Sequence, residues 1–374
     1  MHIEKLSLFN FKNYEEVTFV FSEKVNCFVG VNGSGKTNIL DAIYYLSLTK
    51  SAFNSIDTQN IRFGEIFFNI RGRISSDSKQ FEISCAFQEG GKKVFKVNKK
   101  DYEKLSEHVG RFPVVLIAPN DVAIILEGSE MRRRFFDAIL CQVDRGYLNS
   151  LLKYNHYLRQ RNTALKKFAF TAQVDYDLIQ SYDLPILELG KTIFDSRLNF
   201  IRNFIEIFQK HYAVLSQKNE AVNIIYTSEV AEDDFDVIYK ANIKKDLALE
   251  RTAMGVHRDD FKLSIEGKPI KKFGSQGQQK TFLVALKMAH FEIIQSLKGF
   301  KPILLLDDIF DKLDSQRIGQ LVKMMSDETF GQVFITDARE ERTKAILNEL
   351  NITASFFHIE KGSVKEASYA KKKI

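Results

Sequence analysis

Hydrophobic positions along the chain follow two periods, and their order predicts an α/β protein with a helical insert. Apolar residues at positions 6–9 and an alternating run at residues 17–21 lie on either side of a polar break at residues 12–14, and residues 25–29 form a short apolar run. All three segments are predicted to be β-strands. Residues 37–48 space their apolar side chains three or four apart, which is the period of an amphipathic helix. Strand-like runs between residues 67 and 97 and at residues 112–117 complete this first segment.

The middle of the chain follows the helical period almost throughout. Between residues 129 and 215 it contains one proline, Pro185, and it lacks the sustained heptads of a long coiled coil. Strand and helix patterns alternate again afterwards, at residues 222–226, 261–265, 276–297, 303–306, 313–325, 332–336 and 342–350. We therefore expect an α/β head formed by residues 1–120 together with 255–374, and a mostly helical arm formed by residues 121–254.

The composition argues against a cysteine metal site, a secretory signal and a membrane span. The 374 residues are 44% hydrophobic with a formal net charge of +6, which suits a globular protein and is compatible with a polyanionic partner. Cys27, Cys85 and Cys141 lie far apart without metal-ligand spacing, as expected of thiols in a reducing cytoplasm. Charges come too early for a secretory signal and no apolar run approaches about 18 residues, so we expect a cytoplasmic protein without a membrane span.

A glycine-rich segment between the predicted strand 25–29 and the predicted helix 37–48 carries the strongest chemical signal. Glycines let successive backbone N–H groups wrap phosphate oxygens at the positive end of a helix. The segment matches G-x-x-x-x-G-K-[ST] in its required context and consists of Gly30, Val31, Asn32, Gly33, Ser34, Gly35, Lys36 and Thr37, followed by Asn38. We expect Lys36 to reach the β- and γ-phosphates of ATP and the Thr37 hydroxyl to bind Mg²⁺.

Two consecutive acids, Asp307 and Asp308, follow the apolar run 303–306. A strand that ends in two acids places their carboxylates at the carboxyl edge of the sheet, where phosphates bind in α/β folds. Asp307 is predicted to hold Mg²⁺, usually through water. Asp308 is predicted to orient the attacking water or accept its proton, which makes Asp308 and Lys36 the candidate catalytic residues.

A third motif, residues 274–279, opens the predicted helix 276–297 about 30 residues before the paired acids. It resembles the LSGGQ signature of the ABC ATPase superfamily, with Ser275, Gly277 and Gln278 at matching positions and Gln276 in place of a glycine. A hydroxyl and unpaired N–H groups at a helix N-terminus form an anion site. In that superfamily the signature of one head caps the γ-phosphate held by the opposite head.

Six segments taken together resemble the RecF family of recombination-repair proteins in order and spacing. They are residues 9–13, 30–38, 130–137, 255–260, 273–279 and 304–308. The resemblance spans nearly the whole chain and implies an ABC/SMC-like P-loop ATPase head with an inserted helical arm. It also implies an ATP-dependent homodimer, binding to single-stranded and gapped duplex DNA, and cooperation with RecO and RecR in placing RecA on single-stranded DNA.

Other superfamily positions match less closely. Residues 311–314 resemble the D-loop, and the resemblance places Lys12 and Asn13 beside the nucleotide. Asp337 stands where many relatives have a switch histidine, and residues 119–121 stand where a glutamine loop is expected, without the glutamine. Asp308 is one methylene shorter than the glutamate common in ABC proteins, from which we infer slow hydrolysis that serves as a switch.

A basic stretch in the predicted arm is a candidate DNA-binding strip. Residues 150–168 contain no acid, and the cations of the stretch are Lys153, Arg159, Arg161, Lys166 and Lys167. Interleaved Tyr154, Tyr157 and Phe168 could stack on bases, while the cations follow phosphates. An ordinary solvated helix face with its aromatics in the core of the arm explains the same pattern. Arg132, Arg133 and Arg134 are a second candidate, although one of them could pair with an acid instead.

Three other classes of protein use the same head motifs. A transporter nucleotide-binding subunit fits the early strands less well and would have an unusual insert before the signature. The insert is far too short for the long arm of a chromosome-organising SMC protein. A nuclease fusion would need an acidic metal-binding domain, and none is seen up to residue 374.

Overall fold

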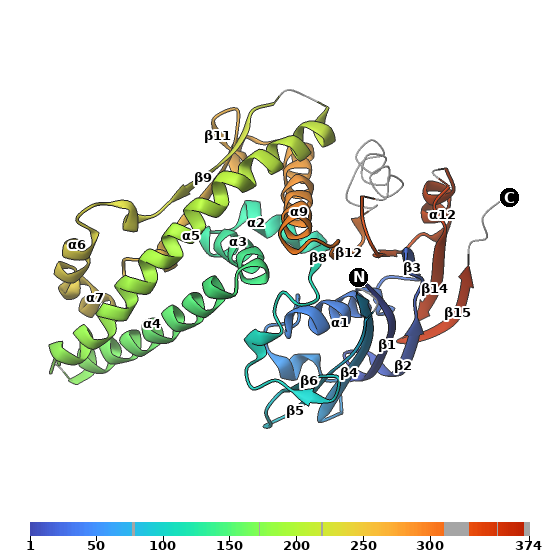
Figure 1. Cartoon of the computed structure of the whole chain (residues 1–374), viewed down its shortest axis with the longest axis horizontal. Helices are drawn as coiled ribbons and strands as arrows, with labels where there is room; N and C mark the ends of the chain where they lie inside the picture. The colour runs from blue at the N-terminus through green and yellow to red at the C-terminus, as the bar shows by residue number, and fades with distance from the viewer. Residues whose placement is uncertain (77–78, 172, 218–219, 310–328, 350, 370–374) are drawn as a thin grey trace. The chain divides into compact units, whose positions relative to one another are not determined.

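The chain forms two compact units (Figure 1). The computed structural model describes residues 1–76, 79–171, 173–217, 220–309, 329–349 and 351–369. Unit 1 contains residues 1–121, 211–217 and 280–374, and unit 2 contains residues 122–210 and 218–279. These bounds correct the predicted arm, because residues 255–279 belong with unit 2, where β10 (Asp260–Ile265) pairs with β9 (Val222–Thr227).

Unit 1 contains a six-stranded sheet in the order β15-β14-β3-β13-β12-β8. Five of these strands are parallel and β15 is antiparallel. The strands are β3 (Val25–Val29), β8 (Val114–Ile117), β12 (Ile303–Leu306), β13 (Val333–Asp337), β14 (Ala354–Glu360) and β15 (Ser363–Tyr369). Every residue of β3, β8, β12 and β13 is buried, which explains their uninterrupted apolar runs. Their carboxyl ends therefore meet at one edge, as predicted.

A second, antiparallel sheet of unit 1 has the order β2-β1-β4-β5-β6-β7. Its strands are β1 (His2–Phe11), β2 (Tyr14–Val20), β4 (Phe67–Ser76), β5 (Lys79–Gln88), β6 (Val94–Val97) and β7 (Lys100–Asp101). Helix α1 (Lys36–Leu48) contacts β4 and β5 of this sheet and β8 and β13 of the parallel sheet. The two sheets and α1 thus share one hydrophobic core, in which Phe19, Phe21, Phe28, Phe334 and Phe357 pack against one another.

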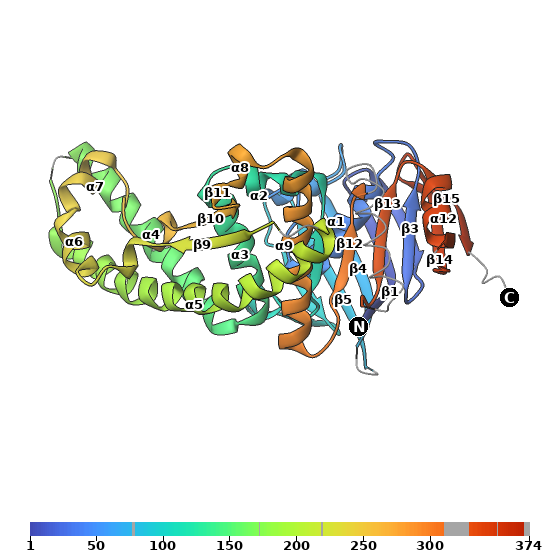
Figure 2. The ribbon, with the colours of Figure 1, turned by 90° about the horizontal axis from the view of Figure 1, so that it is seen from above.

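Unit 2 is mostly helical, as the period of the sequence predicts. Its helices are α2 (Ala123–Leu126), α3 (Ser129–Val143), α4 (Arg145–Thr171), α5 (Tyr176–Ser216), α6 (Phe235–Ala241), α7 (Ile243–Leu249) and α8 (Ile270–Phe273). A three-stranded antiparallel sheet, β11-β10-β9, completes it, with β11 at Lys268–Pro269. The long helices α4 and α5 run side by side (Figure 2) and are joined by an ion pair between Arg161 and Asp183.

Two helices continue from unit 2 into unit 1. They are α5, whose residues from 211 belong to unit 1, and α9 (Gln276–Lys298), whose residues from 280 belong to unit 1. Unit 1 also contains α12 (Glu340–Glu349), within the predicted segment 342–350 apart from its first residues. The predicted helix 313–325 and the D-loop positions 311–314 lie outside the described residues.

Candidate nucleotide-binding site

The glycine-rich loop connects β3 directly to α1, and its backbone requires glycine at three positions. Gly30, Gly33 and Gly35 have φ angles of 151°, 80° and 116°, which other residues rarely adopt. A Cβ atom on Gly30 would lie 2.2 Å from the Ile359 carbonyl oxygen, and one on Gly35 would lie 2.4 Å from Asn13 Nδ2. Any side chain at Gly30 or Gly35 would therefore push the loop out of this shape.

The polar groups of the loop suit a bound phosphate. Lys36 is 4% exposed, and its ammonium donates to the Gly30 and Val31 carbonyls at 2.8 and 3.0 Å. Burial lowers the pKa of Lys36, while the carboxylates of Asp308 and Asp307 oppose that shift. The buried Ser34 Oγ has no hydrogen-bond partner within the described residues. A buried cation and an unused hydroxyl at the N-terminus of α1 fit a polyphosphate.

The first acid of the pair lies against the last residue of the loop. Thr37 Oγ1 donates to Asp307 Oδ1 at 2.8 Å, which joins positions 270 residues apart. Asp307 follows the last residue of β12 and its backbone N–H donates to the Ile117 carbonyl of β8 at 2.8 Å. Burial raises the pKa of Asp307, and hydrogen bonds from Thr336 and Thr37 act in the opposite direction. A hydroxyl and a carboxylate in contact are suitable oxygen donors for Mg²⁺.

The second acid, Asp308, is partly exposed in a left-handed backbone conformation with a φ of 45°. Its backbone N–H donates to Thr336 Oγ1 at 2.9 Å. The same threonine hydroxyl donates to Asp307 Oδ1 at 2.7 Å. Sequence motifs do not single out Thr336, although its place at the end of β13 next to β12 was a usable signal.

Residues from the β1–β2 turn and from the β14–β15 turn form hydrogen bonds to the glycine-rich loop. Asn13 Nδ2 and the Gly362 N–H both donate to the Ser34 carbonyl at 3.0 Å. Asn38 Nδ2 donates to Asn13 Oδ1 at 2.7 Å, and the Tyr14 hydroxyl donates to the Gly35 carbonyl at 3.1 Å. Asn13 and Asn38 therefore contact the loop and each other, whereas the contributions of Tyr14 and Gly362 are invisible in the motif.

Lys12 has a different environment from its neighbour Asn13. Its ammonium forms an ion pair with the buried Asp41 at 2.5 Å and lies 5.5 Å from the centre of the Phe53 ring. Asp41 also accepts hydrogen bonds from the Ser51 hydroxyl and the Ala52 N–H, both at 2.7 Å. This ion pair holds the Lys12 ammonium on the side chain of Asp41, and the placement of Lys12 beside the nucleotide stays a prediction.

The signature-like motif forms the N-terminus of α9 in unit 2. The Gln278 N–H donates to Ser275 Oγ at 3.2 Å, and the Ser275 N–H donates to Gln278 Oε1 at 2.7 Å. This reciprocal pair is a capping box and leaves Ser275 exposed. Gly277, two positions after Ser275, has no Cβ that could cover the helix end. The residue pattern thus creates an exposed helix N-terminus.

Asp337 at the predicted switch position and Asp121 in the predicted glutamine-loop segment both form contacts within unit 1. Asp337 accepts hydrogen bonds from the Arg339 N–H at 3.0 Å, from the Arg342 side chain at 2.7 Å and from the Thr343 hydroxyl at 2.6 Å, so it connects the end of β13 to the first turn of α12. Asp121, in the predicted glutamine-loop segment, forms an ion pair with Lys287 at 2.6 Å. Both carboxylates hold elements of unit 1 in place.

Helix α4 separates the predicted DNA contacts into two groups. Lys153, Arg159, Lys166 and Lys167 are exposed. Arg161 is 0% exposed and forms ion pairs with Asp183 and Asp246 at 2.6 and 2.7 Å, so its prediction as a DNA contact is wrong.

The aromatic residues of the strip and the arginine triplet are mostly engaged inside unit 2. Tyr154 and Phe168 are buried, which agrees with the interpretation that they belong to the core of the arm. Arg132 forms an ion pair with Asp260 at 2.7 Å, and Arg133 donates to the Asp259 carbonyl at 2.5 Å. Arg134 is exposed beside Glu130.

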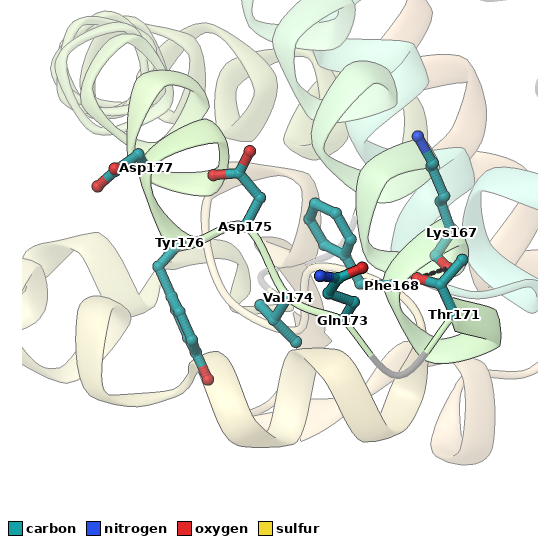
Figure 3. Close-up of a pocket in the computed structure, with 8 residues that line it drawn as sticks. All are labelled: Lys167, Phe168, Thr171, Gln173, Val174, Asp175, Tyr176 and Asp177. Atoms are coloured by element: carbon teal, nitrogen blue, oxygen red, sulfur yellow. Dashed lines mark hydrogen bonds between the residues drawn. The ribbon is translucent and has the colours of Figure 1, made fainter.

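An open hollow of about 600 Å³ lies between the facing ends of α4 and α5 (Figure 3). Cations, acids and apolar groups all contribute to its lining, which consists of Lys167, Phe168, Thr171, Gln173, Val174, Asp175, Tyr176 and Asp177. The Phe168 ring points into it, whereas the Asp177 carboxylate points away in Figure 3. This mixture of groups does not favour one class of ligand.

Neither a clustered metal site nor a membrane span occurs in the described ranges. No group of three or more His, Cys, Asp or Glu side chains there is placed to hold a metal ion. None of the described helices combines the length and the hydropathy that crossing a membrane requires.

Comparison with known proteins identifies relatives over nearly the full length. Residues 2–359 match the family described as the RecF/RecN/SMC N terminal domain. The DNA replication and repair protein RecF of Flavobacterium johnsoniae is 47% identical, over 96% of this chain and 100% of that protein. The corresponding protein of Cytophaga hutchinsonii is 46% identical, over 98% of this chain and 97% of that protein.

Solved structures agree with these sequence relatives. The recombination mediator protein RecF-ATPrS of the RecFOR pathway has a TM-score of 0.86 at 32% identity, covering 97% of both chains. RecF-ATP has the same TM-score at 30% identity, covering 99% of both chains. The Smc head domain of Pyrococcus furiosus shares the fold at 18% identity, with a TM-score of 0.57 over 99% of this chain and 96% of that chain. The fold is that of a P-loop ATPase head of the ABC/SMC type, and the chain belongs to the RecF family of DNA replication and repair proteins.

Proposed function

We propose that this chain is a cytoplasmic, ATP-switched DNA-binding protein of recombinational repair and replication-fork maintenance. The observation that carries the proposal is the contact between Thr37 and Asp307, because it joins the glycine-rich loop to the acidic strand end. RecF relatives that are 47% and 46% identical, and solved RecF structures described with ATP and ATPrS, support the same conclusion.

The loop residues Gly30 to Asn38 would hold the phosphates of ATP. Lys36 would turn its ammonium from the loop carbonyls to the β- and γ-phosphates, and Ser34 Oγ would gain an acceptor. Thr37 and Asp307 would hold Mg²⁺, which supplies charge neutralisation for the phosphates when bound. Lys12, next to Asn13, would lie beside the nucleotide, with its ammonium held by the ion pair with Asp41.

Hydrolysis would depend on Asp308 in the same site. Its carboxylate would orient a water molecule and accept its proton as the oxygen attacks the γ-phosphorus and ADP leaves. The short side chain of Asp308 favours slow turnover, which suits a switch that releases DNA more than a motor. We expect weak, DNA-dependent ATPase activity.

Two heads would meet so that each completes the site of the other. The N-terminus of α9 supports this arrangement, because the Ser275 side chain is exposed there, next to the partly exposed Gly277 and Gln278. Each cap would contact the γ-phosphate bound by the opposite subunit. ATP would then stabilise a homodimer, and hydrolysis would weaken it.

DNA is the proposed partner of the closed dimer, with single-stranded gaps in duplex DNA as preferred sites. The exposed cations of α4, Lys153, Arg159, Lys166 and Lys167, would contact phosphates. Cooperation with RecO and RecR in placing RecA follows from the family, and the naming of relatives in the RecFOR pathway supports it.

Light scattering of the purified chain tests the proposal. The mass is measured without nucleotide, with ATP and Mg²⁺, and with ATP, Mg²⁺ and gapped DNA. We expect the mass to double with ATP and Mg²⁺ and a dimer–DNA complex to form with all three. The variant Lys36→Ala should stay monomeric throughout, because it loses the cation of the loop. A wild-type chain that stays monomeric under all three conditions would overturn the dimer model.

A further inference from the structure

One buried hydroxyl connects the two acids of the site. Thr336 is 0% exposed at the carboxyl end of β13, where it pairs in register with Phe28 of β3. Its Oγ1 lies 2.7 Å from Asp307 Oδ1 and 2.9 Å from the backbone nitrogen of Asp308. A single side chain of one strand thus contacts both acids of the neighbouring strand end.

The donors and acceptors of this contact have only one arrangement. A hydroxyl has one proton and can also accept hydrogen bonds. The Asp308 N–H is a donor, so Thr336 accepts from it, and the Thr336 proton goes to the Asp307 carboxylate. Serine could replace Thr336 in this arrangement, whereas valine, which has nearly the same shape, could make neither bond.

The contact orients each acid in a different way. Asp307 Oδ1 accepts from both Thr37 and Thr336, so these two hydroxyls fix the direction of the carboxylate. For Asp308 the bond holds the backbone, which has a φ of 45° and is disfavoured for a residue with a side chain. Without the hydroxyl, both side chains gain freedom at the point where ATP chemistry needs them fixed.

We propose that Thr336 is a positioning residue, which presents Asp307 to the metal and Asp308 to the attacking water. This inference rests on the proposed ATPase function of the site. It adds a residue from β13 to a site otherwise formed by the glycine-rich loop and the end of β12. Thr336 does not touch the nucleotide in this role, and acts through the two acids.

The test compares three variants with the wild-type chain. Thr336→Val removes the hydroxyl, and Thr336→Ser keeps it. Thr343→Val is the matched control, because Thr343 is also 0% exposed and donates to a carboxylate, that of Asp337, outside the acid pair. Binding of a fluorescent ATP analogue is measured with Mg²⁺ and with a chelator, and steady-state hydrolysis gives kcat and KM.

Mg²⁺ should increase the affinity for the ATP analogue at least about tenfold less in Thr336→Val than in the wild type, because hydrogen bonds to charged groups typically contribute this much. In the presence of chelator, the two chains should bind the analogue equally. Its kcat should fall by at least about tenfold with little change in KM. Thr336→Ser should restore both quantities to within about threefold, and Thr343→Val should lower thermal stability while leaving both unchanged.

Two results would overturn the inference. One is a Thr336→Val variant that matches the wild type in Mg²⁺-dependent binding and in kcat. The other is a Thr343→Val variant with equal losses, because general loosening of the fold would then explain the effect. If Thr336→Val does not fold, a folded Thr336→Ser variant that loses about tenfold or more in kcat and in Mg²⁺-dependent affinity also contradicts it, because serine keeps the hydroxyl. A wild-type chain that binds no ATP refutes the proposed function itself, and the role of Thr336 falls with it.

Discussion

Arg159 and Arg161 lie two residues apart on α4 and have opposite environments. Arg159 is exposed, whereas Arg161 donates to Asp183, Asp246 and Thr252 and lies 5.2 Å from the Tyr239 ring centre. Burial raises the pKa of Asp183, and the Arg161 charge opposes that shift. The ion pairs of Arg161 therefore keep two buried carboxylates compensated.

Replacing Arg161 by methionine should destabilise unit 2 strongly. The change leaves Asp183 and Asp246 without their cation, and breaking a buried ion pair in this way costs about 3–5 kcal/mol. Urea unfolding measures the loss. Arg159→Met, two positions along the same helix, is the control and should change stability by less than about 0.5 kcal/mol. Equal stability of the two variants would contradict the assigned burial.

The spacing of residues along α4 indicates that Arg161 is buried while Arg159 is exposed. Tyr154, Arg161, Leu165 and Phe168 are spaced by seven, four and three residues, so they share one helix face, and all four are buried. The helical period alone thus assigns Arg161 to the core side. The charge pattern alone does not, because it treats every cation of the stretch as solvated. For a single residue such as Arg161, the helical period predicts whether its side chain is buried, but only the folded structure shows which acids it contacts.

At the scale of elements, the hairpin β14–β15 has a direct role in shaping the glycine-rich loop. Gly362 lies in its turn with a φ of 76°, and its N–H donates to the Ser34 carbonyl. A Cβ on Gly362 would lie 2.3 Å from the Asn13 carbonyl oxygen. The turn therefore fits against the loop only when glycine occupies this position.

Gly362→Ala should weaken ATP binding by about tenfold, because the loop must shift to relieve the clash with Asn13. Titration with a fluorescent ATP analogue measures the effect. Gly90→Ala is the matched control: Gly90 has a φ of 71°, but an added Cβ meets nothing within 4 Å. In both variants the positive φ angle should lower the free energy of unfolding by roughly 1–2 kcal/mol. Only Gly362→Ala should also lose affinity for the ATP analogue.

The exposed strip of α4 leads to a second prediction at this scale. Neutralising Lys153, Arg159 and Lys166 to glutamine should weaken DNA binding and reduce the slope of log affinity against log salt by up to about three. Fluorescence anisotropy at several salt concentrations measures the slope. Glutamine at three exposed lysines of unit 1, Lys50, Lys92 and Lys104, is the charge-matched control. An unchanged slope would remove the strip from the DNA site.

Local patterns predicted most elements, but they did not reveal which segments remote in sequence contact one another. The uninterrupted apolar runs of β3 and β12 and the helical period of α9 are local signals, and all three elements are present. The strands β14 and β15 were not predicted, and β14 pairs with β3, whose residues are more than 300 positions away. The contact between Gly362 and the glycine-rich loop depends on that pairing, so the sequence did not predict it either.

At the scale of the whole molecule, dimerisation should depend on the exposed end of α9. Ser275→Arg places a bulky cation on the cap and should block ATP-driven doubling of mass, while each monomer still binds ATP. Light scattering and the ATP-analogue titration together separate the two effects. Ser296→Arg, an exposed position near the other end of the same helix, is the control and should dimerise normally. Normal dimerisation of Ser275→Arg would show that the cap is not at the joint.

The strand order of the parallel sheet has a consequence for synthesis on the ribosome. Strands β3 and β8 are translated early, but their sheet neighbours β12, β13 and β14 belong to the last part of the chain. At about 5–20 residues per second, residues 122–279 alone take roughly 10 to 30 s to make. During that delay two apolar strands have unpaired edges, which favour aggregation. A nascent chain of this protein should therefore need chaperone protection until its C-terminal third emerges.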